Sequence, residues 1–162
     1  MAGEVMKVVA ATVRPMADPA LAVANHEEMI ALRPWPKDFD AAKMEGARRD
    51  YYLPQQQRWP ERLKTESPWP VRLNVVRIGD AAVCTNPAEL FVEHGLAIKQ
   101  KSPARVTLIA QLTDGYCGYV PTKLAFHRGG YSTWPARSSQ LVPEAGEVMA
   151  EKTAILLRRV FG

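Results

Sequence analysis

The spacing of apolar positions along this 162-residue chain changes from a helical period to the two-residue period of strands. Residues 3–14 repeat valine at every fourth position, which predicts a short amphipathic helix that packs on a sheet. Residues 20–33 alternate apolar with small or polar side chains and so predict a strand with a bulge. The polar stretch that follows contains three Trp-Pro pairs, and we expect helices near 37–49 and 54–65 that pack on the domain.

A hairpin and a longer helix are expected in the middle of the chain. Residues 71–75 and 81–84 are apolar runs that flank Gly79-Asp80, a two-residue turn signal that predicts two paired strands. A helix is expected from residue 86 to about residue 101. Its first residue is an asparagine, a favourable N-cap, and the next is a proline, a favourable first helical residue.

The last third continues the alternation of strands and helices. The β-branched run over 106–112 predicts a buried strand, and a helical turn over 121–126 and a closing helix over 143–160 follow. This order predicts an α/β fold in which helices cover a mixed β-sheet, and the length favours one domain over residues 1–162. If the strands at 81–85 and 106–112 are neighbours, the loops after them open at the same sheet edge, where α/β proteins bind ligands.

Composition narrows the classes of function. The chain is 47% hydrophobic and 23% charged, as in ordinary globular domains, and its net charge of +4 comes from dispersed lysines and arginines. A nucleic-acid surface would gather those residues among aromatics, so we expect no nucleic-acid partner. No apolar stretch is long enough for a transmembrane segment or a secretory signal, and the compartment stays unknown. Cys84 and Cys117 fit no paired spacing and are expected to be free thiols.

Side chains that could carry chemistry gather between residues 86 and 131. Glu89 follows Asn-Pro-Ala at the expected helix start, Tyr119 ends a Tyr-Cys-Gly-Tyr turn, and Tyr131 follows two glycines. Carboxylate and phenol oxygens can bind a metal ion, and a tyrosine hydroxyl can donate to a developing oxyanion. Each residue also has a structural explanation. A glutamate in the first turn of a helix favours its dipole, and tyrosines near strand ends often pack half-buried.

The order and spacing of these segments resemble the distal, C-terminal part of the catalytic domain of the neutral/alkaline, non-lysosomal ceramidases and their shorter bacterial relatives. Those proteins are zinc amidases. The segments are Asn-Pro-Ala-Glu ending at Glu89, Leu-Thr-Asp-Gly-Tyr-Cys-Gly-Tyr-Val-Pro-Thr over 112–122, and Gly-Tyr ending at Tyr131. The resemblance implies that Glu89 and Tyr119 bind zinc together with two histidines from the earlier half of the domain. It also implies that Tyr131 contacts the reacting amide.

The resemblance covers residues 70–162 well and residues 1–70 only loosely. The chain is therefore expected to correspond to half of a ceramidase-like catalytic domain, a fragment of a larger hydrolase that could itself be secreted. Ala88 stands where the family has glycine, and the Phe-His-Arg-Gly-Gly segment over 126–130 departs from the family's more acidic, glutamine-containing segment. The expected substrate is thus a lipid-like or small amide rather than ceramide in particular, and metal-activated water would hydrolyse its C–N bond.

The three histidines do not complete such a site. His94 lies five residues after Glu89, about 140° round the predicted helix, so the two cannot bind one ion from the same face. His127, near Tyr131, is expected in solvent, and His26 has no visible partner in its strand. Zinc is therefore expected only if the missing histidine ligands come from the proximal half, in cis or in trans. The chain alone is expected to be weak or inactive.

Two other functions stay open. The chain could be a noncatalytic assembly or oligomerisation module whose exposed sheet edge or apolar face pairs with a partner or with itself. It could also be a small independent esterase that uses His127 or a cysteine such as Cys117, although no orienting third residue accompanies them. Self-association, or pairing with the missing proximal half, is the expected interaction.

Overall fold

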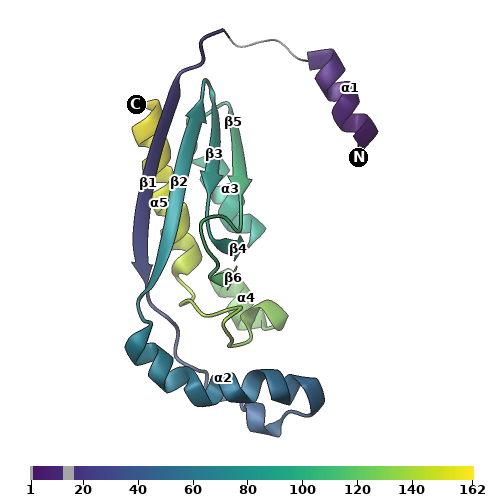
Figure 1. Cartoon of the computed structure of the whole chain (residues 1–162), viewed down its shortest axis with the longest axis vertical. Coiled ribbons are helices and arrows are strands. Elements are labelled where there is room, and N and C mark those ends of the chain that lie inside the picture. The colour runs from purple at the N-terminus through teal and green to yellow at the C-terminus, as the bar shows by residue number, and fades with distance from the viewer. Residues whose placement is uncertain (1, 13–16) are drawn as a thin grey trace.

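The computed structural model describes residues 2–12 and 17–162 and has an α/β fold, as the sequence predicts (Figure 1). The helices are α1 (Ala2–Thr12), α2 (Gly46–Thr65), α3 (Val92–Gln100), α4 (Lys123–Arg128) and α5 (Ala145–Phe161), with short 3-10 helices η1 (Ala41–Lys43) and η2 (Tyr131–Thr133). The strands are β1 (Leu21–Ile30), β2 (Trp69–Ile78), β3 (Ala81–Thr85), β4 (Ala88–Leu90), β5 (Val106–Ala110) and β6 (Gly118–Val120). Among the described residues, no helix has both the length and the apolar character needed to cross a bilayer.

The main sheet is mixed, with the strand order β1-β2-β3-β5. β1, β2 and β3 pair antiparallel, whereas β3 and β5 pair parallel. The predicted hairpin joins β2 to β3 at Gly79, whose φ of +60° is a conformation that glycine adopts without steric cost. Because β3 and β5 are parallel neighbours, their carboxyl ends lie at the same edge of the sheet. A second, two-stranded sheet of β4 and β6 lies beyond that edge.

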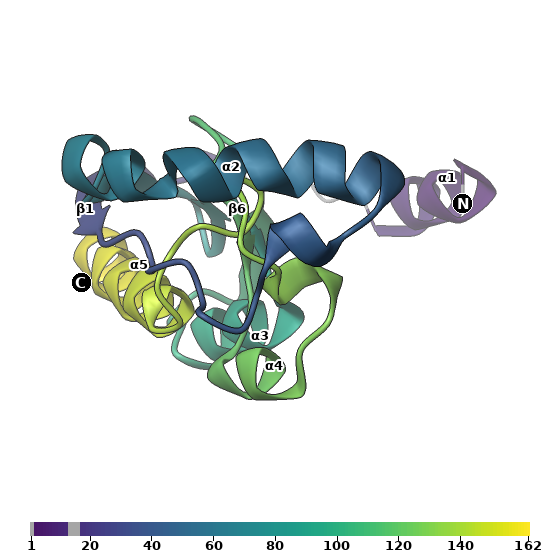
Figure 2. The same cartoon turned by 90° about the horizontal axis from the view of Figure 1, so that it is seen from below.

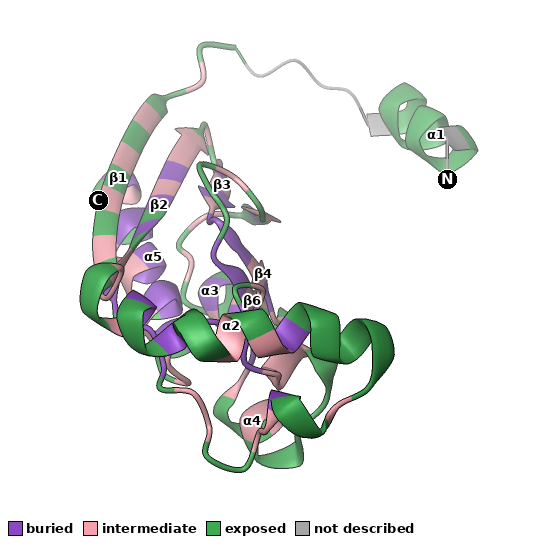
Figure 3. Cartoon of the chain, turned by 60° about the horizontal axis from the view of Figure 1, so that its bottom comes forward, coloured by how far each residue is buried: buried purple, intermediate pink, exposed green. Residues whose placement is uncertain are grey.

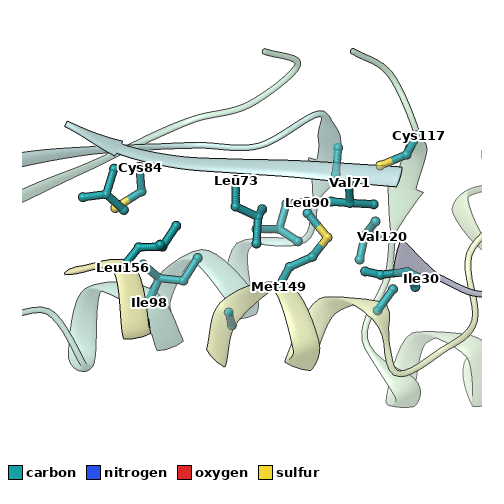
Figure 4. Packing of buried hydrophobic residues seen from close by; sticks show 14 of the residues in the cluster. Ile30, Val71, Leu73, Cys84, Leu90, Ile98, Cys117, Val120, Met149 and Leu156 are labelled. Atoms are coloured by element: carbon teal, nitrogen blue, oxygen red, sulfur yellow. The ribbon is translucent and has the colours of Figure 1, made fainter. Parts of the chain in front are cut away.

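The hydrophobic core lies on one face of the main sheet, between the sheet and the helices α5 and α3 (Figure 4). The inward side chains of β2 include Val71 and Leu73, which are fully buried. α5 presents Met149 and Leu156 to them, at the seven-residue spacing that places two side chains on one helix face. The predicted closing helix is thus confirmed, and its apolar stripe makes most of the contact with the sheet.

Two predictions about the strands are wrong. β1 contains no bulge, because its register with β2 runs unbroken from Leu21 opposite Ile78 to Ile30 opposite Trp69. β5 is an edge strand rather than a buried one, and Val106 and Leu108 are exposed. Both faces of a run of β-branched residues are apolar, so the sequence alone could not tell that helices cover only one of them.

The region before β2 also differs from the prediction. The two helices expected near 37–49 and 54–65 are a 3-10 turn followed by the single long helix α2, which crosses one end of the molecule (Figure 2). α2 contains Pro54 and Pro60, which lack the N–H of a helical hydrogen bond. Its buried residues Tyr52, Trp59 and Arg62 hold it against the rest of the chain, and the Trp59 indole N–H donates to the Arg33 carbonyl at 2.9 Å. Tertiary packing therefore overrides the helix-breaking tendency of proline.

The N-terminal helix does not pack on the sheet, which contradicts the prediction. All side chains of α1 from residue 3 to residue 11 are exposed (Figure 3). The helix itself forms where its valine repeat predicts. Its apolar side therefore has no sheet beneath it in this structure.

The helix predicted over 86–101 is wrong in its first half. β4 occupies residues 88–90, and α3 begins only at Val92. The Asn86 side chain does accept a hydrogen bond from the Ala88 N–H at 3.0 Å, but as part of a turn that leads into a strand. The Pro87 carbonyl accepts from the Cys117 N–H at 2.9 Å, so pairing with the β6 segment competes with helix formation and prevails.

Candidate active site

The candidate site lies at the shared carboxyl edge of β3 and β5. The Asn86 N–H after β3 donates to the Ala110 carbonyl at the end of β5, at 3.0 Å. The Thr113 N–H donates back to the Asn86 carbonyl at 3.0 Å. These bonds bring the segments after the two strands together, and β4 and β6 then pair in parallel.

Glu89 and Tyr119 lie directly opposite each other in that pair of strands. Residues that are opposite in a sheet project to the same side, with Cβ atoms about 5 Å apart. Glu89 is therefore in a strand and not in the first turn of a helix, and its orientation follows from the ladder. The Tyr116 hydroxyl also donates to Glu89 Oε1 at 3.0 Å.

Tyr131 lies beside Tyr119 but comes from a different segment of the chain. Its ring lies edge-to-face on the Tyr119 ring, with the centroids 5.9 Å apart and the planes at 77°. It stands at the start of η2, after Gly129 and Gly130, whose φ values of +75° and +114° favour glycine. The Tyr131 side chain is exposed, so its hydroxyl can meet a ligand. The three residues singled out by sequence thus come together, although their chemical roles stay predictions.

The electrostatics of the site keep the Tyr116 and Tyr119 hydroxyls protonated. The hydrogen bond and negative charge of Glu89 raise the pKa of the Tyr119 hydroxyl above its ordinary value. Partial desolvation, together with the hydrogen bond to Glu89, raises the pKa of Tyr116 to about 12. At neutral pH both phenols therefore keep their protons, and the Tyr116 hydroxyl donates its hydrogen bond to the Glu89 carboxylate.

The histidines lie elsewhere. His94 is 6% exposed and packs against Gly146 of α5, with Nε2 3.4 Å from the Pro121 carbonyl oxygen. The sequence argument separated His94 from Glu89 by their angle around one helix. That argument does not apply, because Glu89 lies in β4 and not on α3. His26 Nε2 lies 2.6 Å from a carboxylate oxygen of Glu28, on the main sheet. His127 is exposed on α4, as expected.

The residues present do not make a zinc site by themselves. Within residues 2–12 and 17–162, no three His, Cys, Asp or Glu side chains are placed to hold a metal ion. Glu89 and Tyr119 offer two oxygen atoms, whereas a catalytic zinc takes three protein ligands and a water. The pair fits part of such a site, and the remaining ligands would have to come from other residues.

The thiols are poorly suited to nucleophilic chemistry. Burial raises the pKa of Cys84 to about 11 and that of Cys117 to about 12. A thiolate, the reactive form, is therefore scarce at neutral pH. This weighs against an esterase based on either cysteine.

Two features of the site were missed from the sequence. One is Tyr116, three residues before Tyr119, whose role depends on a contact with Glu89 that no local pattern reveals. The other is a pocket of about 410 Å³ beside Tyr131. It is lined by Ala47, Arg48, Tyr51, Tyr52, Tyr131 and Trp134. The Tyr51-Tyr52 pair in a largely polar helix was the available signal, because two adjacent side chains on a helix cannot both face the core; Tyr52 is buried and Tyr51 is 48% exposed.

No protein-family model and no curated protein matches the sequence. Among solved structures, the chain is similar to a ceramidase complexed with C2, at 22% identity and a TM-score of 0.49. It is also similar to neutral ceramidase from Pseudomonas aeruginosa, at 19% identity and a TM-score of 0.50. Each alignment covers 59% of this chain and 16% of the ceramidase, so the match spans about a sixth of that protein. At these identities the likeness concerns the fold alone, and the fold of this chain is similar to that of part of neutral ceramidase.

Proposed function

We propose that this chain contributes one part of the active site of a ceramidase-like amidohydrolase, and that other residues, in cis or in trans, complete the site. The observation that carries the proposal is the parallel pairing of β4 with β6. It sets Glu89 opposite Tyr119, and the Tyr131 ring from η2 packs against the Tyr119 ring. The ceramidase-like spacing of these residues and the similar fold support the same conclusion.

Each side chain has a role in this proposal. Glu89 and Tyr119 provide a pair of oxygen ligands, held in place by the strand ladder on which they sit. Tyr116 fixes the Glu89 carboxylate by its hydrogen bond. Tyr131, whose side chain is exposed, donates its hydroxyl hydrogen to the oxygen of the scissile carbonyl as negative charge develops there.

The pocket beside Tyr131 suggests the class of substrate. Its walls are mostly aromatic, and a single cationic side chain, Arg48, lies over the Trp134 ring at 5.4 Å. An apolar acyl or aryl group fits such walls, and the amide carbonyl at its end would then lie near Tyr131. We therefore propose an amide with an apolar substituent as the substrate.

A segment exchange tests this function. Residues 70–162 replace the corresponding segment of neutral ceramidase, which supplies the rest of its own site, and circular dichroism verifies that the chimaera folds. We expect the chimaera to bind zinc and to hydrolyse a short-chain N-acyl amide. Glu89→Gln should lower its zinc content, whereas Tyr131→Phe should preserve zinc and lower kcat about 10²- to 10³-fold.

Ser132→Ala is the control for Tyr131→Phe, because it removes a hydroxyl from the neighbouring residue of η2, within the exchanged segment. It should leave kcat within about twofold of the parent value. A folded, zinc-loaded chimaera whose activity is insensitive to both Glu89→Gln and Tyr131→Phe would refute the assignment.

A further inference from the structure

No element within residues 2–12 and 17–162 covers the face of the main sheet opposite α5. In Figure 1 the sheet is turned toward the viewer, with α3 and α5 behind it. The register of the strands places two rows of apolar side chains across this face, one residue from each of the four strands in each row. The rows are Leu21, Ile78, Ala81 and Val106, and Val23, Val76, Val83 and Leu108. We call these eight residues the apolar half of the open face.

The side chains of the apolar half are exposed to solvent, although an exposed sheet face ordinarily has polar residues. Leu21 is 73% exposed, Val23 67% and Leu108 54%. A sheet face that meets only water ordinarily alternates to polar side chains. The next rows of the same face do so, because they contain Asn25 opposite Asn74 and Glu27 opposite Arg72. The two halves of the face therefore differ in what they are suited to contact.

α1 has the complementary surface. Val5, Met6 and Val9 lie along one side of the helix, and Val5 is 60% exposed. Glu4 and Lys7, paired at 3.0 Å, lie on the opposite side. An isolated helix of 11 residues is marginal in water, so packing of its apolar side is needed to stabilise it.

Size and chain length favour α1 over a second copy of the sheet. Two rows across four strands span about 14 Å by 7 Å, and a helix of this length is about 16 Å long and 10 Å wide. A stable dimer buries about 800 Å² on each partner, several times the area of the two rows. Eight residues separate Thr12 from Leu21. They can span up to about 28 Å, and Leu21 itself belongs to the first row.

We propose that the apolar half of the open face is the docking surface for the chain's own α1, which stands apart from the sheet in this structure and would dock there through Val5, Met6 and Val9. The docked helix covers the end of the sheet near the Gly79 turn. The polar rows stay open, next to Asp114, whose carboxylate accepts a hydrogen bond from Asn74 at 2.7 Å. α1 therefore covers the apolar surface without covering the candidate active site.

Paramagnetic relaxation in NMR spectra tests the docking. A nitroxide is attached at Lys7→Cys, on the polar side of α1, where it does not obstruct the proposed contact. Cys84 and Cys117 are buried and stay unlabelled. In a ¹⁵N-labelled chain that carries the nitroxide, we expect the amide signals of Val76 and Val83 to lose most of their intensity. Unchanged intensities would overturn the proposal.

A mixed sample separates docking within one chain from exchange between chains. The nitroxide is placed on a chain without ¹⁵N, which is mixed with a ¹⁵N chain without nitroxide. We expect no loss of intensity for Val76 and Val83 in this sample. A loss equal to that in the singly labelled chain would show that α1 docks on a second copy, and would overturn the proposal of docking within one chain.

Two matched variants test the surface itself. Val9→Asp places a charge on the apolar side of α1, and Ala11→Asp places the same charge about 160° away on the helix. We expect Val9→Asp to restore the intensities of Val76 and Val83, and Ala11→Asp to leave them reduced. Losses that persist in Val9→Asp would show that the apolar side is not the contact.

Discussion

At the scale of single residues, the candidate site depends on side chains that orient one another. Glu89 accepts a hydrogen bond from Tyr116, and its charge also raises the pKa of Tyr119. Tyr119 in turn packs against Tyr131 through its ring. The carboxylate thus holds Tyr116 directly, and Tyr119 lies between the carboxylate and Tyr131.

Tyr116→Phe removes the hydroxyl that donates to Glu89 and little else. Because Tyr116 is about half exposed, water can replace the lost hydrogen bond in part. We expect the free energy of unfolding to fall by about 0.5–1 kcal/mol, as measured by urea denaturation. Tyr51→Phe, at a similarly exposed tyrosine, is the control and should change stability by less. Equal effects of the two variants would show that the bond to Glu89 contributes nothing.

The Glu66 carboxylate makes the stability of the α2 region depend on pH. The hydrogen bond from Arg62, and the charges of Arg62 and Arg137, lower the pKa of Glu66 below its ordinary value of 4.5. The stabilisation is therefore complete above about pH 4.5 and is lost as the pH falls through the lower, folded-state pKa. Arg62 is buried, so loss of its partner is costly.

Glu66→Gln should lower the free energy of unfolding by about 1–3 kcal/mol at pH 7, measured in urea. The difference from the parent chain should shrink below pH 4.5, where the parent carboxylate also becomes protonated. Glu61→Gln is the control on the same helix, because Glu61 is exposed and lies 3.7 Å from Lys64. It should change stability by less than about 0.5 kcal/mol. A Glu66→Gln difference that stays constant down to pH 3 would contradict this explanation.

The proximity of the three candidate residues could be predicted from the sequence, whereas their surroundings could not, and their roles stay predictions. Glu89, Tyr119 and Tyr131 were selected by spacing, and the structure brings them together. Tyr116 was missed because a hydrogen bond between residues 27 positions apart leaves no local pattern. His94 was set aside for a wrong reason, since its separation from Glu89 was calculated on a helix that begins only at Val92.

At the scale of elements, the contact between α3 and α5 depends on a glycine. A Cβ at Gly146, near the start of α5, would collide with the His94 ring of α3. The ring is buried and cannot move aside without displacing α3. Small residues at such a crossing allow two helices to approach closely, so the requirement at this position is for space and not for backbone conformation.

Gly146→Ala should lower the free energy of unfolding by about 1–3 kcal/mol, because the added methyl forces the two helices apart. Gly95→Ala on α3 is the matched control, since its Cβ would meet only Ile109 Cγ1, at an ordinary 3.8 Å. The control should be neutral or more stable by up to about 1 kcal/mol, because alanine favours helix more than glycine. Thermal or urea denaturation measures both. A Gly146→Ala variant as stable as Gly95→Ala would mean that His94 is not confined.

Elements with strong periodic patterns were predicted well, and elements decided by tertiary contacts were not. The valine repeat of α1, the hairpin at Gly79 and the stripe of α5 form where the sequence indicates. β4 forms where a helix was predicted, because its residues pair with β6. That strand lies about 30 residues further along the chain, so the pairing leaves no local pattern in the sequence. α2 continues through Pro54 and Pro60 because its buried side chains outweigh the local cost.

At the scale of the whole molecule, helices cover one face of the sheet and leave the other open. The α/β class and the shared carboxyl edge of β3 and β5 follow from the order of elements. The open face could not be predicted, because a β-branched strand looks the same whether one face or both are covered. The chain spans about a sixth of neutral ceramidase, whose fold it resembles in part. The central claim is accordingly that this chain holds a share of an active site.

Isothermal titration calorimetry with Zn²⁺ tests that claim most directly. A carboxylate and a phenol are too few ligands for tight binding, so we expect the chain alone to bind zinc with an affinity weaker than micromolar. Glu89→Ala should weaken this binding further, and Glu93→Ala, at an exposed glutamate on α3, should not change it. Submicromolar binding by the unaltered chain, abolished by Glu89→Ala, would contradict the claim, because the site would then be complete.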